Sequence, residues 1–156
     1  MNGFRYGEGV QIVPLLCEAV SASFASSYVK ISNANWLTLL VAVGTCDTAT
    51  TLTVEASTAV STTGAYTIPF QYRLSGAINS DTWSAITTCD SAGFALVAST
   101  DSSKVVLIDI DPSSLDDGYN YIHLIGTATN YSTAMATTVI AMLEARYKQL
   151  NPISSS

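Results

Sequence analysis

His123 is the only histidine in the chain, and it is the first residue to consider as a general base. It lies in a period-two apolar segment, residues 119–125, where alternation places it on one face of a strand with Tyr121 and Ile125. A general base needs a nucleophile or an orienting carboxylate within hydrogen-bond reach, and the sequence has no GxSxG elbow or similar motif. We therefore interpret His123 as an ordinary strand histidine and predict that the protein is not an enzyme.

The three cysteines, Cys17, Cys46 and Cys89, are far apart in the sequence. A zinc site needs several His or Cys ligands at short spacings, which three distant cysteines and one histidine do not supply. An odd count without dense spacing also does not make a disulfide framework. We expect reduced thiols, as in a protein assembled in the cytosol, and we expect neither a metal ion nor a cofactor.

One stretch, residues 109–118, gathers carboxylates at Asp109, Asp111, Asp116 and Asp117. Calcium prefers several oxygen ligands from a compact loop, but this spacing matches no EF-hand loop. We interpret the stretch as a solvated turn. Alternatively, its carboxylates could bind a basic patch on a partner protein.

Four aromatic residues, Trp36, Phe70, Tyr72 and Trp83, could form a platform on which a sugar stacks. Aromatic residues at alternate strand positions are more often part of a core, which is the interpretation we favour. Exposed aromatics on one concave face would favour the carbohydrate platform instead.

The composition is poor in charge for a globular protein. Charged residues make up 12% of the 156 residues, about half the usual fraction, while apolar residues make up 48%. The formal net charge is −6, and the six Lys and Arg residues are scattered, so neither nucleic acid nor an anionic membrane surface is an expected partner. No apolar run approaches the ~20 residues that span a bilayer. So much weakly polar surface on one chain indicates an interface with other subunits.

Period-two alternation between short Thr, Ser, Asp and Gly turns predicts a series of strands. Pro69, within the segment 66–74, cannot donate to a strand ladder, so that strand should lie at an edge or carry a bulge. The segment 36–43 is apolar on both faces, which is typical of a central, covered strand. The predicted strands are 28–32, 36–43, 51–55, 66–74, 82–87, 94–98, 104–110 and 119–127.

The segment 134–147 combines helical spacing of its apolar residues with the β-branched run 137–140, and we favour a strand over a helix. Together these features predict an all-β fold, a single β-sandwich with jelly-roll-like connectivity and an extended N-terminal arm. We expect the arm at residues 1–26, with one strand at 11–17, the sandwich at 27–148 and a flexible tail at 149–156. The apolar residues of the arm are candidates for an assembly interface: Phe4, Tyr6, Val10, Ile12, Val13, Leu15 and Leu16.

The run Phe70-Gln71-Tyr72-Arg73, followed by Ser80-Asp81-Thr82-Trp83, resembles small head proteins of tailed bacteriophages. The resemblance extends over about residues 28–148. It implies a β-sandwich decoration, or cement, protein on the outside of an icosahedral head, and such proteins usually form trimers that grip neighbouring capsomers with N-terminal arms. The family offers no catalytic residues to carry over.

We therefore expect a structural virion protein that binds and stabilises an assembled phage head. Its expected partners are the major capsid protein and further copies of itself, as a trimer. It would be made in the host cytoplasm and lie on the outer surface of the capsid. The alternative is a carbohydrate-binding or host-recognition module of a phage tail or surface.

Overall fold

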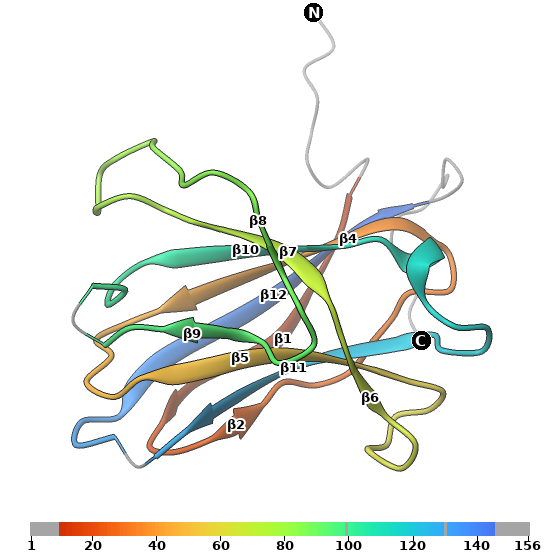
Figure 1. Cartoon of the computed structure of the whole chain (residues 1–156), viewed down its shortest axis with the longest axis horizontal. Helices are drawn as coiled ribbons and strands as arrows, with labels where there is room; N and C mark the ends of the chain where they lie inside the picture. Colours follow the sequence, from red (N-terminus) through yellow and green to blue (C-terminus); the bar gives the residue numbers. More distant parts are fainter. Residues whose placement is uncertain (1–9, 99, 130, 146–156) are drawn as a thin grey trace, which may run out of the picture.

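Two antiparallel sheets packed face to face form the molecule, in a computed structural model that describes residues 10–98, 100–129 and 131–145 (Figure 1). This confirms the predicted all-β sandwich. The described residues contain one short turn of helix, the 3₁₀ element η1 (Pro112–Ser114). None of their helices is long and apolar enough to cross a bilayer.

Both sheets are assembled from strands that are far apart in the sequence. Sheet A has the order β1 (Val10–Val20), β12 (Met135–Ala145), β4 (Ala34–Val43), β10 (Val105–Ile110), β7 (Phe70–Leu74) and β8 (Thr87–Cys89). Sheet B has the order β2 (Phe24–Ala25), β11 (Tyr121–Ala128), β5 (Thr50–Ser57) and β6 (Tyr66–Ile68). In addition, β3 (Val29–Lys30) pairs with β11, and β9 (Phe94–Leu96) pairs with β5.

The connectivity is that of a jelly roll. The four strands β1, β12, β4 and β10 of sheet A face β2 and β3, β11, β5 and β9 of sheet B, so the chain passes repeatedly from one sheet to the other. The segment from β6 to β8 is an insertion in this pattern, and β7 and β8 extend sheet A on the far side of β10. Double-sheet closure of this kind leaves few long edges exposed.

The core lies between the sheets and follows the period of two. In β4, Leu37, Leu39 and Val41 point inward and are fully buried, and Ile122 and Leu124 of β11 meet them from sheet B. Each such side chain contributes about 1.5–3 kcal/mol by leaving water. The alternation that predicted these strands therefore also fixes which face of each strand is buried.

Pro69 separates two strands where the sequence predicted one. β6 ends at Ile68 in sheet B and β7 begins at Phe70 in sheet A, so the chain changes sheets at the proline. Because Pro69 has no N–H to donate, neither ladder loses a bond at this position. The sequence thus indicated an irregularity in the strand at Pro69, but not that the chain passes there from one sheet to the other.

Two other predictions have clear outcomes. The segment 134–147 is a strand, since β12 runs from Met135 to Ala145. A strand at 82–87 is wrong, because Trp83 forms an isolated bridge with Ser75 and β8 begins only at Thr87. Local side-chain bonds compete with strand pairing here: Ser80 Oγ accepts from the backbone N of Thr82 at 3.1 Å.

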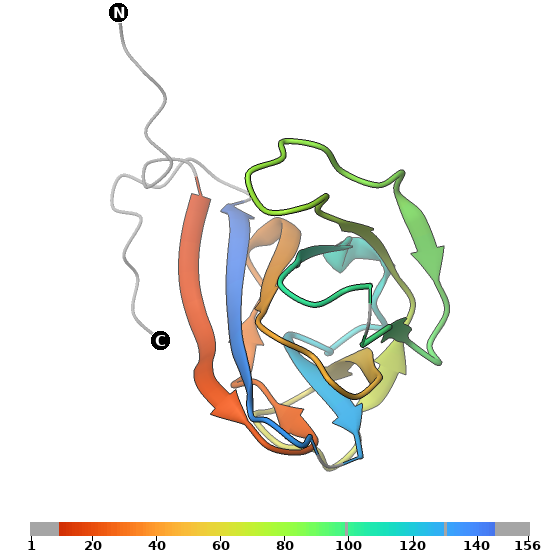
Figure 2. The ribbon, with the colours of Figure 1, turned by 90° about the vertical axis from the view of Figure 1, so that its left-hand side faces the viewer.

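The expected N-terminal arm is corrected for residues 10–26. β1 pairs with β12 from Val10↔Glu144 to Val20↔Met135, and Figure 2 shows the two strands side by side. Leu15 and Val20 are buried in the core. The strand expected at 11–17 is therefore a full member of the sandwich, because β12 offers it a ladder and the core takes its apolar side chains. Residues 1–9 and the predicted tail at 149–156 lie outside the described residues.

Candidate assembly surfaces

The outward face of sheet A is apolar across its middle. Directly paired residues of antiparallel strands share a face, and the pairs Pro14↔Ile140, Ile140↔Leu40 and Leu40↔Leu107 form one row across four strands. An antiparallel sheet that covers a core on one side usually shows polar residues on the other. We call the apolar area of this face the outer patch: Ile12, Pro14, Leu40, Ala42, Val105, Leu107, Ile140 and Met142.

The outer patch is of moderate size. Its eight residues, each covering about 4.8 Å across the sheet and about 6.7 Å along its strand, give roughly 260 Å². This lies just below the ~300–600 Å² of the largest apolar patch on an ordinary monomer, which is often functional. The side chains of this patch are half-buried by one another or exposed, and Ile12 is 51% exposed. The two sheets are the only layers that the described residues form, so no third layer covers the patch there.

Trp36 and Asp109 lie at one rim of the outer patch. Thr38 Oγ1 donates to Asp109 Oδ1 at 2.6 Å, and Trp36 Nε1 donates to the same oxygen at 3.4 Å. These bonds hold the carboxylate within the sheet face. The Trp36 side chain is 38% exposed. The prediction that this aromatic residue belongs to the core is therefore wrong.

The other three aromatic residues are divided between core and surface. Phe70 is buried, and Tyr72 stacks on Phe94 with ring centroids 4.0 Å apart, as the core interpretation predicted. Trp83 is 42% exposed and, paired with Ser75, faces outward at the opposite end of sheet A from Trp36. The four residues therefore do not form one stacking platform.

The edges of sheet A are poorly suited to pairing with another strand. β1 is long, but it carries Pro14, a register shift between Pro14 and Leu16, and the charge of Glu18. At the other edge β8 has three residues. Proline, bulges, charges and short strands are the usual protection of sheet edges. Association through the outer patch is therefore easier than association through an edge.

A structured loop, residues 75–86, connects β7 to β8 and projects from the sandwich; we call it the β7–β8 loop (Figure 1, upper left). Its neck is closed by backbone bonds from Gly76 N to Thr82 O and from Ser84 N to Leu74 O, both 2.8 Å. The Arg73 guanidinium lies 5.5 Å from the centroid of the Trp83 ring. Three large apolar side chains of the loop are exposed: Ile78, Trp83 and Ile86.

A pocket of about 620 Å³ opens where β1 begins and β12 ends; we call it the end pocket. Its lining mixes apolar side chains with tyrosine and amide groups, and Lys30 is the only charged residue among the described residues that line it. The lining residues are Gln11, Val13, Tyr28, Val29, Lys30, Ser32, Asn33, Ala34, Val60, Tyr121, Leu143 and Ala145.

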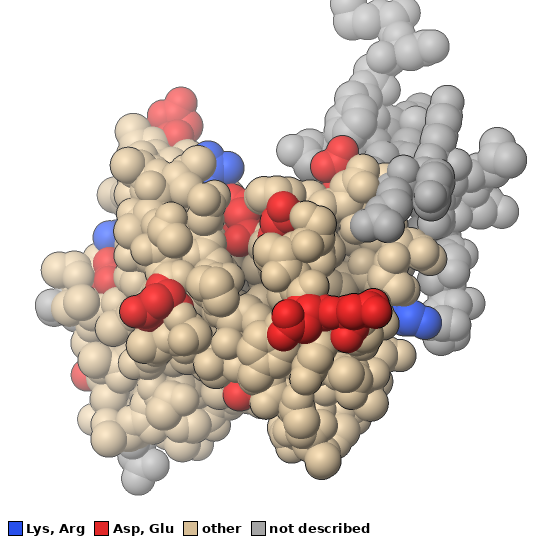
Figure 3. Space-filling view, turned by 45° about the vertical axis from the view of Figure 1, so that its right-hand side comes forward, with Lys and Arg blue, Asp and Glu red and all other residues tan. Residues whose placement is uncertain are grey.

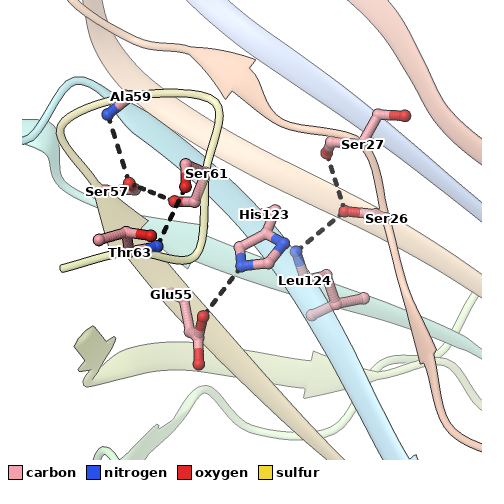
Figure 4. A network of polar contacts seen from close by, with 9 residues as sticks. All are labelled: Ser26, Ser27, Glu55, Ser57, Ala59, Ser61, Thr63, His123 and Leu124. Atoms are coloured by element: carbon pink, nitrogen blue, oxygen red, sulfur yellow. Dashed lines mark hydrogen bonds and ion pairs between the residues drawn. The ribbon is translucent and has the colours of Figure 1, made fainter. Parts of the chain in front are cut away.

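His123 lies on the outward face of sheet B, under the segment that leads into β3 (Figure 4). Its Nε2 lies 3.0 Å from Glu55 Oε2, and the Tyr28 ring stacks on the imidazole with centroids 4.1 Å apart. Ser26 Oγ accepts from the backbone N of Leu124 at 2.9 Å. Burial, and secondarily the charge of Glu55, raises the pKa of Tyr28.

Tyr28, stacked on His123, holds the segment that leads into β3 against sheet B; we call the contacts among Glu55, His123 and Tyr28 the clasp. His123 is 2% exposed, and its Nδ1 has no hydrogen-bond partner among the described residues. The nearby Ser26 hydroxyl is bonded to backbone groups and not to the imidazole. His123 is packed within a strand, as we interpreted it from the sequence. Glu55 supplies an orienting carboxylate that the sequence did not reveal, but no hydroxyl or thiol of the described residues is hydrogen-bonded to the imidazole.

The acidic stretch is a capped turn. Asp111 Oδ1 accepts from Ser113 N at 2.9 Å and from Ser113 Oγ at 2.7 Å, and these bonds lower the pKa of Asp111. Within the described ranges no group of three or more His, Cys, Asp or Glu side chains is placed to hold a metal ion. Cys17 is exposed, Cys46 and Cys89 are buried, and all three are free. Figure 3 shows more acidic than basic side chains on one face of the molecule, most of which carries neither.

The predicted interface residues do not act as one arm. Ile12 belongs to the outer patch, Val13 lines the end pocket and Leu15 lies in the core. Val10 and Leu16 are half-buried in β1, and Phe4 and Tyr6 lie outside the described residues. The outer patch was not predicted from the sequence, although the two apolar faces of 36–43 were its signal. We interpreted that pattern as coverage within the chain.

Comparison with known proteins finds no matching family model, no matching curated protein and no matching solved structure. The fold assignment therefore rests on the strand order and register described above.

Proposed function

We propose that the protein is a structural virion protein that decorates an assembled icosahedral phage head and stabilises it. The observation that supports this most is the outer patch. It gives a small, weakly charged sandwich one broad apolar face that water solvates poorly. The proposed partner is the major capsid protein, on the outer surface of the virion.

The size of the outer patch sets how such binding would work. Burial of roughly 260 Å² at about 25 cal/mol per Å² contributes about 6 kcal/mol gross from this side of the interface. Association costs about 4–15 kcal/mol in lost freedom, so one contact is weak alone. Repeated contacts on a symmetric shell would supply the remainder through effective concentration.

Stabilisation would follow from mass action. A protein that binds the assembled shell more tightly than free shell subunits shifts the equilibrium toward the shell. No covalent chemistry and no cofactor enter this mechanism. The residues that carry it are side chains of the outer patch, above all Leu40, Leu107 and Ile140 in its central row.

The test is binding to undecorated heads. Leu107→Lys and Ile140→Lys place a charge in the central row of the outer patch, and we expect at least about tenfold weaker binding. Thr53→Lys on the outward face of β5 is the matched control and should bind like the parent protein. Equal occupancy by all three folded variants would contradict the proposal.

The alternative, carbohydrate or host recognition, has one observation in its favour. The end pocket brings Tyr28, Tyr121 and Asn33 together with Lys30, a set that can stack on and hydrogen-bond to a sugar. Glycan-array binding that Tyr121→Ala removes would favour this function, whereas the Lys variants of the outer patch would leave it unchanged.

A further inference from the structure

The β7–β8 loop and the end pocket lie at opposite ends of the sandwich. Ala34, which lines the pocket, begins β4, a strand of ten residues and therefore about 33 Å long. The loop begins beyond the other end, where Ser75 N donates to Val105 O at 2.8 Å and Val105 pairs with Ala42. In Figure 1 the loop lies at the upper left, and the C-terminal end of β12, beside which the pocket opens, lies at the upper right. The loop therefore cannot enter the pocket of its own chain.

The two features match in chemistry. The loop presents the exposed apolar residues Ile78 and Trp83, and its one charged residue is Asp81. The pocket offers Val60 and Leu143 as apolar lining, and the one charge among its described lining residues is Lys30. A volume of about 620 Å³ is within the ~300–1,000 Å³ of pockets that enclose a ligand. An apolar side chain at the loop apex would thus contact the apolar lining of the pocket, and the carboxylate of Asp81 would pair with Lys30.

The loop is preorganised, which lowers the cost of inserting it. Gly76 lies against Thr82 so closely that a Cβ there would collide with the threonine hydroxyl. Ser80 Oγ accepts from Thr82 N at 3.1 Å, and Leu74 N donates to Ser84 Oγ at 2.9 Å. Ile78 is nonetheless 71% exposed. A rigid element that carries an exposed apolar tip is typical of a binding anchor.

We propose that the β7–β8 loop of one copy inserts into the end pocket of a second copy, with Asp81 facing Lys30. Such a contact joins two different surfaces and is therefore head-to-tail. Head-to-tail contacts close into a ring when the rotation between subunits allows it. This inference does not depend on binding to a phage head, because the outer patch takes no part in it.

The test exchanges the two charges in the full-length chain. Asp81→Lys and Lys30→Glu each place like charges together, and we expect each to weaken self-association about tenfold, the lower end for close interfacial charge pairs. The double variant restores the attraction and should return to within about threefold of the parent protein. Asp117→Lys, an equal charge change in another exposed loop, is the control and should change nothing.

Analytical ultracentrifugation would measure the dissociation constants, and circular dichroism would check that every variant is folded. A second variant, Ile78→Ser, removes an apolar tip that has little contact within its own chain, and we expect it to weaken association by a similar factor. A parent protein that stays monomeric would overturn the proposal. So would single-charge variants whose effects add in the double variant, because additivity would mean that Asp81 and Lys30 do not face each other.

Discussion

The two sheets bury equivalent faces but present different ones to the outside. On sheet B, Thr51, Thr53 and Glu55 of β5 alternate with fully buried apolar residues and point away from the core. On sheet A, the corresponding positions of β4 and β10 are Leu40, Ala42 and Leu107. The exterior of β5 thus has the polar character of a solvated sheet, whereas the middle of the sheet A exterior has the composition of a second interior face.

This difference separates two roles within one small domain. Sheet B uses its exterior to hold its own chain, through the clasp of Glu55, His123 and Tyr28. Sheet A leaves an apolar exterior without a described cover, so its residues are available to another molecule. The same period of two builds both sheets, and only the choice of outward residues distinguishes them.

The largest expected effect is a difference in unfolding free energy between substitutions at two adjacent residues of β4, one facing the core and one facing outward. Leu39→Ala removes a fully buried side chain and should cost about 2–5 kcal/mol of unfolding free energy. Leu40→Ala on the outward face should cost under about 1.5 kcal/mol, because half-buried atoms lose less by exposure. Urea denaturation measures both, and equal costs would mean that the outer patch is already covered within the chain.

A smaller effect concerns the clasp of sheet B. His123→Ala removes the partner of Glu55 and the stacking surface of Tyr28, and we expect a loss of about 1–3 kcal/mol. Thermal unfolding is the measurement, with Thr127→Ala on the same face of β11 as a control near zero. A loss of biological activity in a folded and assembled His123→Ala variant would instead argue for catalysis.

Two buried tyrosine hydroxyls should differ in what their removal costs. The Tyr131 hydroxyl is hydrogen-bonded to Thr50, so Tyr131→Phe should cost about 1 kcal/mol. The Tyr28 hydroxyl is buried without a partner among the described residues, so Tyr28→Phe should be neutral or slightly stabilising. Chemical denaturation of the two variants compares them directly, and a larger loss for Tyr28→Phe would reveal a partner of that hydroxyl.

The smallest effect is the response to alkaline pH. Burial is the main cause that raises the pKa of both Tyr28 and Tyr131. Above the ordinary tyrosine pKa of ~10 the unfolded chain releases these protons while the folded chain keeps them. The contribution of these two tyrosines to stability should therefore be constant below that pH and be lost as the pH rises through the raised folded values. Denaturation at pH 9 and pH 11 tests this, and the Phe variants should show a shallower fall.

The sequence predicted the architecture well because the alternation of β4, β10 and β11 is governed by burial in one core. It failed where a decision depends on a distant partner. That Val10–Val20 joins the sandwich depends on β12, more than a hundred residues later, which no local pattern reveals. Likewise, the sequence pattern around Leu40 does not distinguish an outward face that another layer covers from one that faces water. Residues 82–87 were predicted to be a strand because the local Ser and Thr hydrogen bonds that hold this part of the loop leave no trace in the periodicity.

The pairing of β1 with β12 also constrains how the protein is made. During synthesis β1 emerges early, but its ladder partner follows only after almost all other strands. Sheet A therefore cannot be completed until Met135–Ala145 has left the ribosome. Until then β1 and β4 each present an unpaired strand edge at the place that β12 will fill. Folds rich in such distant pairings complete on a scale of about milliseconds to seconds, so newly made chains pass through a stage at which they would pair with one another if crowded.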